Sequence, residues 1–296
     1  MQPIGIGSSP VNTGLRILGL NQAERNSALE RLSTGLRINR ASDDPAGMVS
    51  SEAISAALAS LEAESRALDR SQAVINTAEG AIAEISGLLI EAEALAVTAA
   101  NTAGLSETER EALQVEMDSI LQTVDRLAAG AEFNGQKLLD GSFSVPLGDG
   151  SSEKIESLDP SKLGEVYDIE PEVTETGEVI VDPDAVEVTM ADLVSGGAGS
   201  LLENPGLAQR ILERAREQVN TQRGALGALS KNVIAPSLAS IGVQIESLTS
   251  ARSLIRDADF AEESARLIRA NIRTEATIGA ISAGLRNQER VLDLLG

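Results

Sequence analysis

Seven apolar residues recur at intervals of seven positions, without a break, in the N-terminal third of this 296-residue chain. They are Ile54, Leu61, Leu68, Ile75, Ile82, Leu89 and Ala96. A repeat of seven keeps one side of an α-helix apolar, which is typical of helices that pack lengthwise against other helices. Residues 45–101 therefore predict one helix of roughly 85 Å, at a rise of ~1.5 Å per residue. Such a helix is too long for a compact domain, so other long helices must pack beside it.

Shorter rows of the same kind lie near both ends of the chain, over residues 11–36 and 278–295. The apolar members of the first row are Val11, Leu15, Leu18, Leu29, Leu32 and Leu36. The apolar members of the second row, which are expected to face a partner helix, are Ile278, Ile281, Leu285, Leu292 and Leu295. Two terminal helices with rows of the same period are expected to pair with each other, antiparallel, which brings the chain ends together.

Local signals mark where the helices begin and end. Gly35 suits the end of the first helix, and Asp43 and Asp44 before Pro45 suit the start of the long one. Ser106 with Glu109 predicts a capping box at the start of a third helix. A fourth helix is expected from about 205 to 232. Pro236 should then kink or interrupt it, because proline has no backbone N–H.

The middle of the chain, residues 143–203, differs from both helical arms and is called the insert below. It holds 15 Asp and Glu against 2 Lys and Arg, a net −13 out of −21 for the whole chain. Short alternating runs at Val179–Val181 and Val186–Met190 predict small, exposed and loosely packed hairpin strands. The Gly-rich segment 196–199 is expected to be a flexible hinge, and replacing residues 166–203 by a short linker is expected to preserve assembly.

These patterns predict a mainly α protein: a long antiparallel helical bundle or coiled coil formed by the two arms, with a small β-containing insert. We expect three layers along the chain. Residues 1–44 with 255–296 form a terminal coiled coil, residues 45–142 with 204–254 form a long-helix bundle, and residues 143–203 form an acidic surface element.

Composition argues against chemistry. The chain has no cysteine, histidine or tryptophan, so disulfides, zinc sites of Cys or His, and catalysis by either residue are excluded. Of the adjacent carboxylates, Asp43-Asp44 are better explained as helix caps and Glu262-Glu263 as the solvated start of a helix. The Asp182-Pro183-Asp184 run lacks the remaining ligands of a calcium loop. We therefore expect no cofactor, no metal and no enzymatic activity.

The same composition favours assembly. With 41 alanines and only four aromatic residues, the helices are expected to pack at close range. The net charge of −21 argues against nucleic acid and against anionic membrane surfaces, and we expect no membrane-spanning segment and no cleaved secretion signal. Long helices with apolar surface left over need neighbours. Copies of the same chain that contact one another without closing a ring would form a helical fibre.

Several sequence motifs are then recognisable. Residues 31–39 (RLSTGLRIN) and 41–47 (ASDDPAG), the Asn-Gly turn at 134–135, and residues 255–263 (IRDADFAEE) resemble the N- and C-terminal signatures of bacterial flagellins. The match covers both arms and fails over about 166–203. The signature residues are Arg31, Gly35, Asp43, Asp44, Asn134, Gly135, Asp257, Asp259 and Phe260.

The resemblance implies a structural subunit that polymerises into the flagellar filament for motility. It implies export through the flagellum's own channel to the cell exterior, with the terminal helices lining the inner tube and the insert facing outward. The implied partners are further copies of the chain, the hook-associated junction proteins, the filament cap and a secretion chaperone.

One departure concerns immune recognition. In flagellins recognised by the flagellin-sensing Toll-like receptor, an arginine precedes the Leu-Ala-Val segment by four positions, where this chain has Glu91. Leu95 and Glu116 match, but the charge reversal argues against recognition by that receptor. Two alternatives remain at this stage: a flagellin-like hook–filament junction protein, which shares the terminal arms, and a filament protein whose insert acts as an adhesin or binding module.

Overall fold

The computed structural model describes residues 10–101, 104–147, 150–167, 172–173, 179–180 and 186–295, and for a few of them, including 291–295, the backbone alone. The chain forms two compact units. Unit 1 comprises Met1–Leu61 and Val243–Gly296, and unit 2 comprises Glu62–Gly242. Both boundaries fall inside a helix, because α2 (Pro45–Ala100) and α5 (Ala235–Arg256) each contribute to both units.

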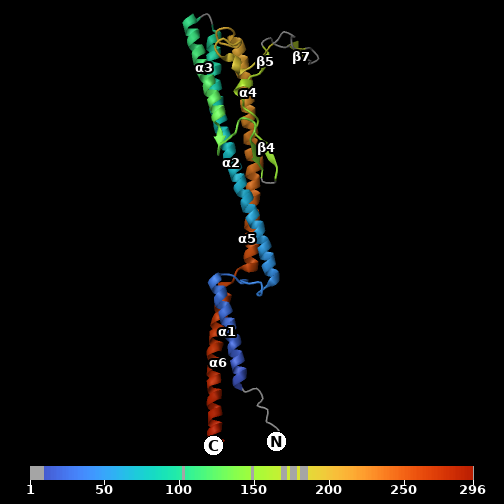
Figure 1. Cartoon of the computed structure of the whole chain (residues 1–296), viewed down its shortest axis with the longest axis vertical. Helices are drawn as coiled ribbons and strands as arrows, with labels where there is room; N and C mark the ends of the chain where they lie inside the picture. Colours follow the sequence, from blue (N-terminus) through green and yellow to red (C-terminus); the bar gives the residue numbers. More distant parts are fainter. Residues whose placement is uncertain are drawn as a thin grey trace. The chain divides into compact units, whose positions relative to one another are not determined.

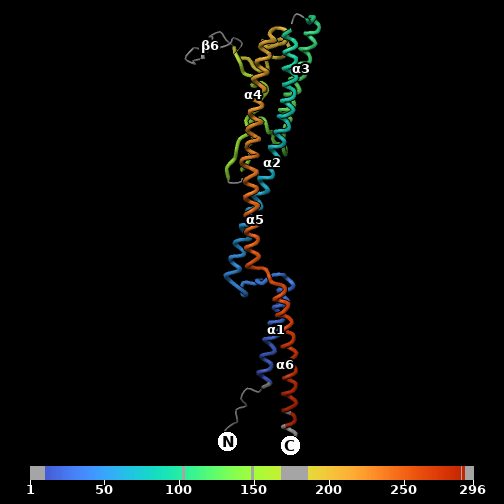
Figure 2. Tube along the Cα trace, turned by 180° about the vertical axis from the view of Figure 1, so that it is seen from behind, coloured from blue at the N-terminus to red at the C-terminus, as the bar shows by residue number. Residues whose placement is uncertain are grey.

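Unit 1 is built on two helices from opposite ends of the chain. Helix α1 (Pro10–Thr34) and helix α6 (Phe260–Leu295) lie side by side and run in opposite directions (Figures 1 and 2), which confirms the expected antiparallel pairing. Helix α1 ends where expected, at Gly35, whose φ of 73° favours glycine. Helix α6 begins far before residue 278, so the pairing uses much more of the C-terminal arm than its apolar row suggested.

Unit 2 contains the larger part of α2 with α3 (Glu107–Gly130) and α4 (Pro205–Leu229) beside it (Figure 1). The predicted capping box opens α3: Glu109 N–H donates to the Ser106 hydroxyl, and the Glu109 carboxylate accepts from Ser106 N–H. The bonds that the Glu109 carboxylate accepts from the Ser106 N–H and from the Ser106 hydroxyl lower the pKa of Glu109. Between α2 and α4, Arg216 Nε lies 3.0 Å from Glu93 Oε2. Unit 2 is thus an antiparallel helical bundle.

The interruption expected at Pro236 takes the form of a π-helical turn, Ser230–Ile234 (η4), which joins α4 to α5. Ala235 N–H donates to Ser230 O, one residue further back than in an α-helix. Since Pro236 cannot donate to the carbonyl four residues earlier, the wider turn accommodates a residue that a regular α-helix cannot.

One stretch differs from the expectation that no segment could cross a membrane. Within Pro205–Arg256, an 18-residue window with a mean hydropathy of 1.2 is long and apolar enough by length and composition alone. Only 17 % of this window is buried inside the subunit, and a single helix of this kind is weak evidence for a membrane span.

The strands are short and occur in antiparallel pairs. Strands β1 (Glu132–Phe133) and β2 (Gln136–Lys137) flank the expected Asn-Gly turn, in which both residues have positive φ. Strands β3 (Ser144–Pro146) and β4 (Ser152–Lys154) form a second pair. The remaining pairs are β5 (Val166–Tyr167) with β8 (Glu187–Val188), and β6 (Glu172–Val173) with β7 (Val179–Ile180). Strands β7 and β8 fall in the predicted runs, but each pairs with an upstream strand; Val181 lies outside the described residues.

The insert has two flanks that contain buried residues, one from Val145 to Leu163 and one from Val188 to Leu201. This is contrary to the expectation of a loosely packed element. Short 3₁₀ turns, η2 (Pro160–Lys162) and η3 (Met190–Leu193), lie among these buried residues. Eight apolar side chains there are at most 6 % exposed: Val145, Ile155, Leu158, Leu163, Val188, Met190, Leu193 and Leu201. The two flanks therefore belong to the core of unit 2.

The Gly-rich segment 196–199 is held in place, so the expectation of a flexible hinge was wrong. Buried Gln114 on α3 donates to Leu193 O at 2.8 Å and accepts from Leu201 N–H at 2.7 Å. A Cβ on Gly197 would lie 2.2 Å from Asp192 O, so only glycine fits there. The glycines serve close packing of the backbone rather than freedom of movement.

Candidate functional site

The contact between α1 and α6 is made by small and polar side chains. Asn21 Nδ2 donates to Thr277 Oγ1 at 3.1 Å, and Arg273 Nη1 lies 3.1 Å from Glu24 Oε2. Ala28 and Ala270, at matching levels, are buried. Small residues allow two helices to approach closely, so the terminal pair is narrow and leaves its larger side chains at the edges.

Near the start of α1, the backbone of Gly14 lies close to α6. A Cβ on Gly14 would lie 2.7 Å from Ile281 Cγ1. A shallow apolar groove of about 430 Å³ runs between the helices at this point. Its lining includes Val11, Gly14, Ile17, Ala280, Ile281 and Gly284. The sequence pattern placed Val11 and Ile281 on this contact, but not the two glycines.

Some residues of the predicted terminal rows lie in the α1–α6 contact, and others are exposed to solvent. Leu18, Leu32 and Leu36 are partly covered, whereas Leu15 and Leu29 are 52 % and 46 % exposed. The most buried positions of α1, Asn21 and Ala28, come one residue before Gln22 and Leu29, through which the predicted row passes. The helices meet along small side chains instead. On α6, Ile278 and Leu285 are also exposed, and the side chains of Leu292 and Leu295 lie outside the described residues.

A short ladder joins the linkers that lead out of α1 and into α6. Leu36 and Asp257 form an antiparallel bridge, Arg37 N–H donates to Arg256 O at 2.7 Å, and Ala258 N–H donates to Gly35 O at 2.9 Å. These bonds fix the level at which the terminal helices begin to pair. We call this ladder the joint; two of the signature residues, Gly35 and Asp257, form part of it.

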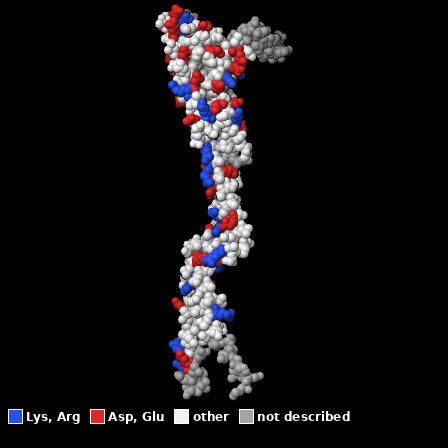
Figure 3. All heavy atoms as spheres, in the orientation of Figure 1, with Lys and Arg blue, Asp and Glu red and all other residues white. Residues whose placement is uncertain are grey.

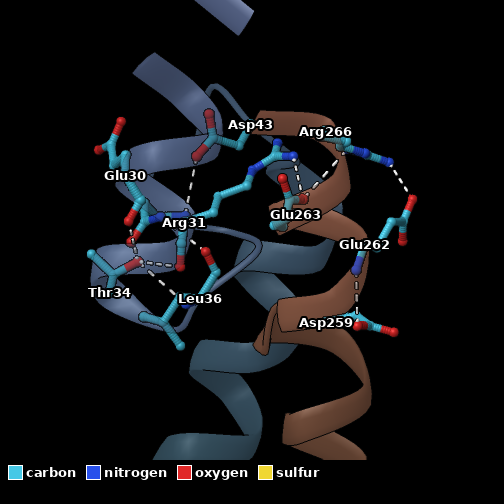
Figure 4. A network of polar contacts seen from close by, with 10 residues as sticks. Glu30, Arg31, Thr34, Leu36, Asp43, Asp259, Glu262, Glu263 and Arg266 are labelled. Carbon is cyan, nitrogen blue, oxygen red and sulfur yellow. Dashed lines mark hydrogen bonds and ion pairs between the residues drawn. The ribbon is translucent and has the colours of Figure 1, made fainter. Parts of the chain in front are cut away.

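A buried carboxylate lies next to this joint, and sequence reasoning missed it (Figure 4). Glu263 looked like part of a solvated helix start, yet it is only 4 % exposed. Its Oε1 lies 3.1 Å from Arg31 Nη1 on α1 and 3.4 Å from Arg266 Nη1 on α6. The hydrogen bond that Arg266 donates to the Glu262 carboxylate, together with the charge of Glu263, raises the pKa of Arg266. The sequence offered one signal of its burial. Glu263 lies seven positions before Ala270 and fourteen before Thr277, which places it on the side of α6 that faces α1.

The signature residues between α1 and α2 form a tight turn. The Asp43 carboxylate accepts from Arg40 N–H at 2.9 Å and Asn39 N–H at 3.1 Å, and these bonds lower the pKa of Asp43. Asp44 caps α2 by accepting from Gly47 N–H at 2.9 Å. A Cβ on Gly47 would lie 2.4 Å from Asp44 Oδ2 and 2.7 Å from Ile38 Cδ1, so a larger residue at position 47 would displace the capping carboxylate.

The C-terminal signature caps α6. The Asp259 carboxylate accepts from Ala261 N–H at 2.8 Å and from Glu262 N–H at 3.1 Å. Phe260, one of the few aromatic residues, is more than half exposed at the first position of the helix. Asp257 thus acts through its own backbone, in the bridge to Leu36, and Asp259 acts through its carboxylate as a cap, whereas the Phe260 side chain is available to something outside the subunit.

The row along α2 is buried most completely in unit 2. Leu68, Ile75, Ile82, Leu89 and Ala96 are fully buried, and Ile54 and Leu61 in unit 1 are half-buried. On the outer side of the bundle, Glu91 and Glu116 are exposed and Leu95 is half-buried. These three lie on the neighbouring helices α2 and α3, and no side-chain hydrogen bond or ion pair joins them.

The two units carry very different charge. Unit 1 holds 13 Asp and Glu against 12 Lys and Arg, a net −1, and unit 2 holds 32 against 12, a net −20. The face of α1 and α6 drawn in Figure 3 is mostly uncharged. Exposed apolar side chains lie on the same pair: Leu15, Ile17, Leu20, Leu29, Ile268, Ile272, Ile278 and Leu285. Unit 1 is therefore suited to contact with other protein, without strong repulsion between copies.

Among the residues that the structure describes, no three Asp or Glu side chains gather closely enough to hold a metal ion. The surface that stands out in the described residues is the exposed apolar one on α1 and α6.

Comparisons with known proteins agree with this description. Residues 9–144 match the bacterial flagellin N-terminal helical region, and residues 210–295 match the C-terminal helical region. The chain is 29 % identical to a flagellin of Bacillus subtilis, with 96 % of this chain and 97 % of that protein aligned. It is 31 % identical to a flagellin of Halalkalibacterium halodurans, with 97 % of each aligned. The crystal structure of Bacillus cereus flagellin matches with a TM-score of 0.41 at 18 % identity, over 62 % of this chain and 88 % of that one.

Proposed function

The chain belongs to the bacterial flagellin family and is a structural subunit of the flagellar filament, and from this premise we propose how its parts divide the work of assembly. Residues 1–44 and 255–296 form the innermost layer of the filament. Residues 45–142 and 204–254 form the next layer, and the insert, residues 143–203, faces outward.

The exposed apolar surface of α1 and α6 is the observation that carries this proposal. A lone subunit leaves Ile268 and Ile272 about 60 % exposed, one turn apart on α6. Burying such side chains against another copy is favourable by about 25 cal/mol per Å² of apolar area. The near-neutral charge of unit 1 allows this burial, whereas the −20 of unit 2 is best kept where water and salt screen it.

Partners other than the chain itself follow from the family. We propose that the terminal pair contacts the junction proteins at the hook and the cap at the filament tip, and that a chaperone covers the C-terminal helix before export. Export proceeds without a cleaved signal and ends in the extracellular filament.

Flagellins are structural proteins, and we propose that this chain has no enzymatic activity. The exposed Glu91, in place of the expected arginine, supports weak or absent recognition by the flagellin-sensing Toll-like receptor. The junction-protein alternative is not favoured, because the relatives that align over nearly the whole chain are flagellins. The adhesin alternative is likewise not favoured.

One substitution tests the role of the exposed α6 face. Ile272→Glu should leave the monomer folded, because the side chain is 61 % exposed and touches little of its own subunit. It should strongly reduce polymerisation, since assembly would bury an unpaired charge. The measurement is the fraction of protein that sediments after ammonium sulfate is added, with circular dichroism as the check on folding.

Val194→Glu is the matched control, because it adds the same charge to an exposed apolar residue of the proposed outer segment. It should sediment like the parent protein. If Ile272→Glu also sediments like the parent, the α6 face is not an assembly surface. If Val194→Glu alone fails to assemble, the order of the layers is wrong.

A further inference from the structure

Helix α4 continues into α5, but the residues buried in α5 do not continue the heptad row of residues buried in α4. In α4, Leu212, Val219 and Leu226 are buried at intervals of seven. Continued as a regular helix, this row would next reach Val233 and Ser240. The buried residues are instead Ile234 and Ile241, each one position later, while Ser240 is exposed.

The second row of α4 shows the same displacement. Ala208, Ala215 and Gln222 are buried at intervals of seven, and their continuation would reach Leu229, Pro236 and Val243. Val243 is instead 67 % exposed. Leu254, two heptads after Ser240 on the first row's continuation, is 83 % exposed. The positions that α4 would direct inward are therefore the outward positions of α5.

The π-helical turn lies between the two rows and has the size needed to displace them. A π turn accommodates one more residue than an α turn, which shifts the sequence register of the following helix by one residue, or about 100° around the helix axis. The turn ends with the bond from Ala235 N–H to Ser230 O. It begins where Ser230 Oγ contacts Gln72 Oε1 of α2 at 2.9 Å, so the point of displacement is fixed against the neighbouring helix.

We propose that Pro236, through the π-helical turn that precedes it, selects which face of α5 packs inward and which faces out. The sequence of α5 carries apolar residues on both faces. Ile234 and Ile241 serve the inward face in the displaced arrangement, and Val243 and Leu254 would serve it in an undisplaced one. Pro236 decides between them because a regular α-helix would need a backbone N–H at that position.

The proposal is independent of the function proposed above, although it fixes which α5 residues remain available to neighbouring copies in a filament. It is tested with single cysteines, because the chain has none of its own. Ile241→Cys reports the inward face, Val243→Cys reports the outward face, and Leu226→Cys on α4 is the control for an intact bundle. The measurement is the rate at which each thiol reacts with a maleimide in the full-length monomer.

In the parent protein, position 243 should react at least about ten-fold faster than position 241, since packing slows access to a buried thiol. Pro236→Ala should lose or reverse this difference, with position 226 still slow. Pro236→Ala combined with deletion of Asn232 should restore the parent order, because removing one residue supplies the displacement without a π turn.

Two results would overturn the proposal. One is a Pro236→Ala protein with the parent order of rates, which would mean that packing alone holds the turn. The other is failure of the Asn232 deletion to restore that order. The deletion variant decides the question by itself if Pro236→Ala alone unfolds the bundle and position 226 becomes reactive.

Discussion

Removal of residues 278–296 is expected to abolish filament formation while leaving a soluble, folded monomer. These residues pair with the first turns of α1, where Ile281 approaches Gly14. Without them, the N-terminal half of α1 loses its partner, and an isolated amphipathic helix of that length is marginal in water. Unit 2 does not include this segment and should keep its thermal transition. Sedimentation after salting out measures assembly, and circular dichroism measures the remaining helix.

A variant of unchanged length separates pairing from mere chain length. Replacing residues 278–296 by a Gly/Ser segment of equal length removes the apolar row and the helix but keeps the chain. It should fail to assemble as completely as the truncation does. Filaments of normal morphology from either variant would show that the terminal pair is not needed for assembly.

The second large effect concerns the insert, where the structure changes the prediction from sequence. Replacing residues 168–185 by a short Gly/Ser linker should leave both stability and assembly close to those of the parent. The ends of that replacement are already adjacent, because Tyr167 pairs with Glu187 and Val166 with Val188. A short linker can therefore close the gap without pulling the flanks apart.

Extending the replacement to residues 166–203 should instead unfold or severely destabilise unit 2. It removes Val188, Met190, Leu193 and Leu201, all at most 2 % exposed, and deprives the buried Gln114 amide of its bonds to Leu193 and Leu201. Truncating one such side chain typically costs about 2–5 kcal/mol, so together they approach the ~5–15 kcal/mol stability of a whole domain. Thermal unfolding followed by circular dichroism distinguishes the two replacements. Equal transitions would mean that the packed flanks contribute nothing to stability.

Regular helical periodicity was the most informative part of the sequence. The row on α2 predicted a helix from 45 to 101, and the structure has Pro45–Ala100. The capping box at Ser106 and the turn at Asn134-Gly135 were also predictable, because each depends on neighbours within a few residues. Local chemistry is sufficient for features of this kind.

Features that depend on contacts between distant segments were predicted less well. The α1–α6 contact follows Asn21 and Ala28 rather than Leu15 and Leu29, since the closeness of two helices depends on which small residues meet. Glu263 looked solvated because its partner, Arg31, lies 232 positions away in sequence. The buried flanks of the insert were missed because strands of two or three residues carry too little periodicity to show what covers them.

We expect this chain, on its own, to build a filament through its terminal helices. The test is electron microscopy of the purified full-length protein in negative stain, before and after addition of ammonium sulfate. We predict dispersed monomers before addition and long tubes of uniform width, about that of a flagellum, afterwards. Amorphous aggregate or persistent monomers, under conditions in which circular dichroism shows a folded chain, would contradict it.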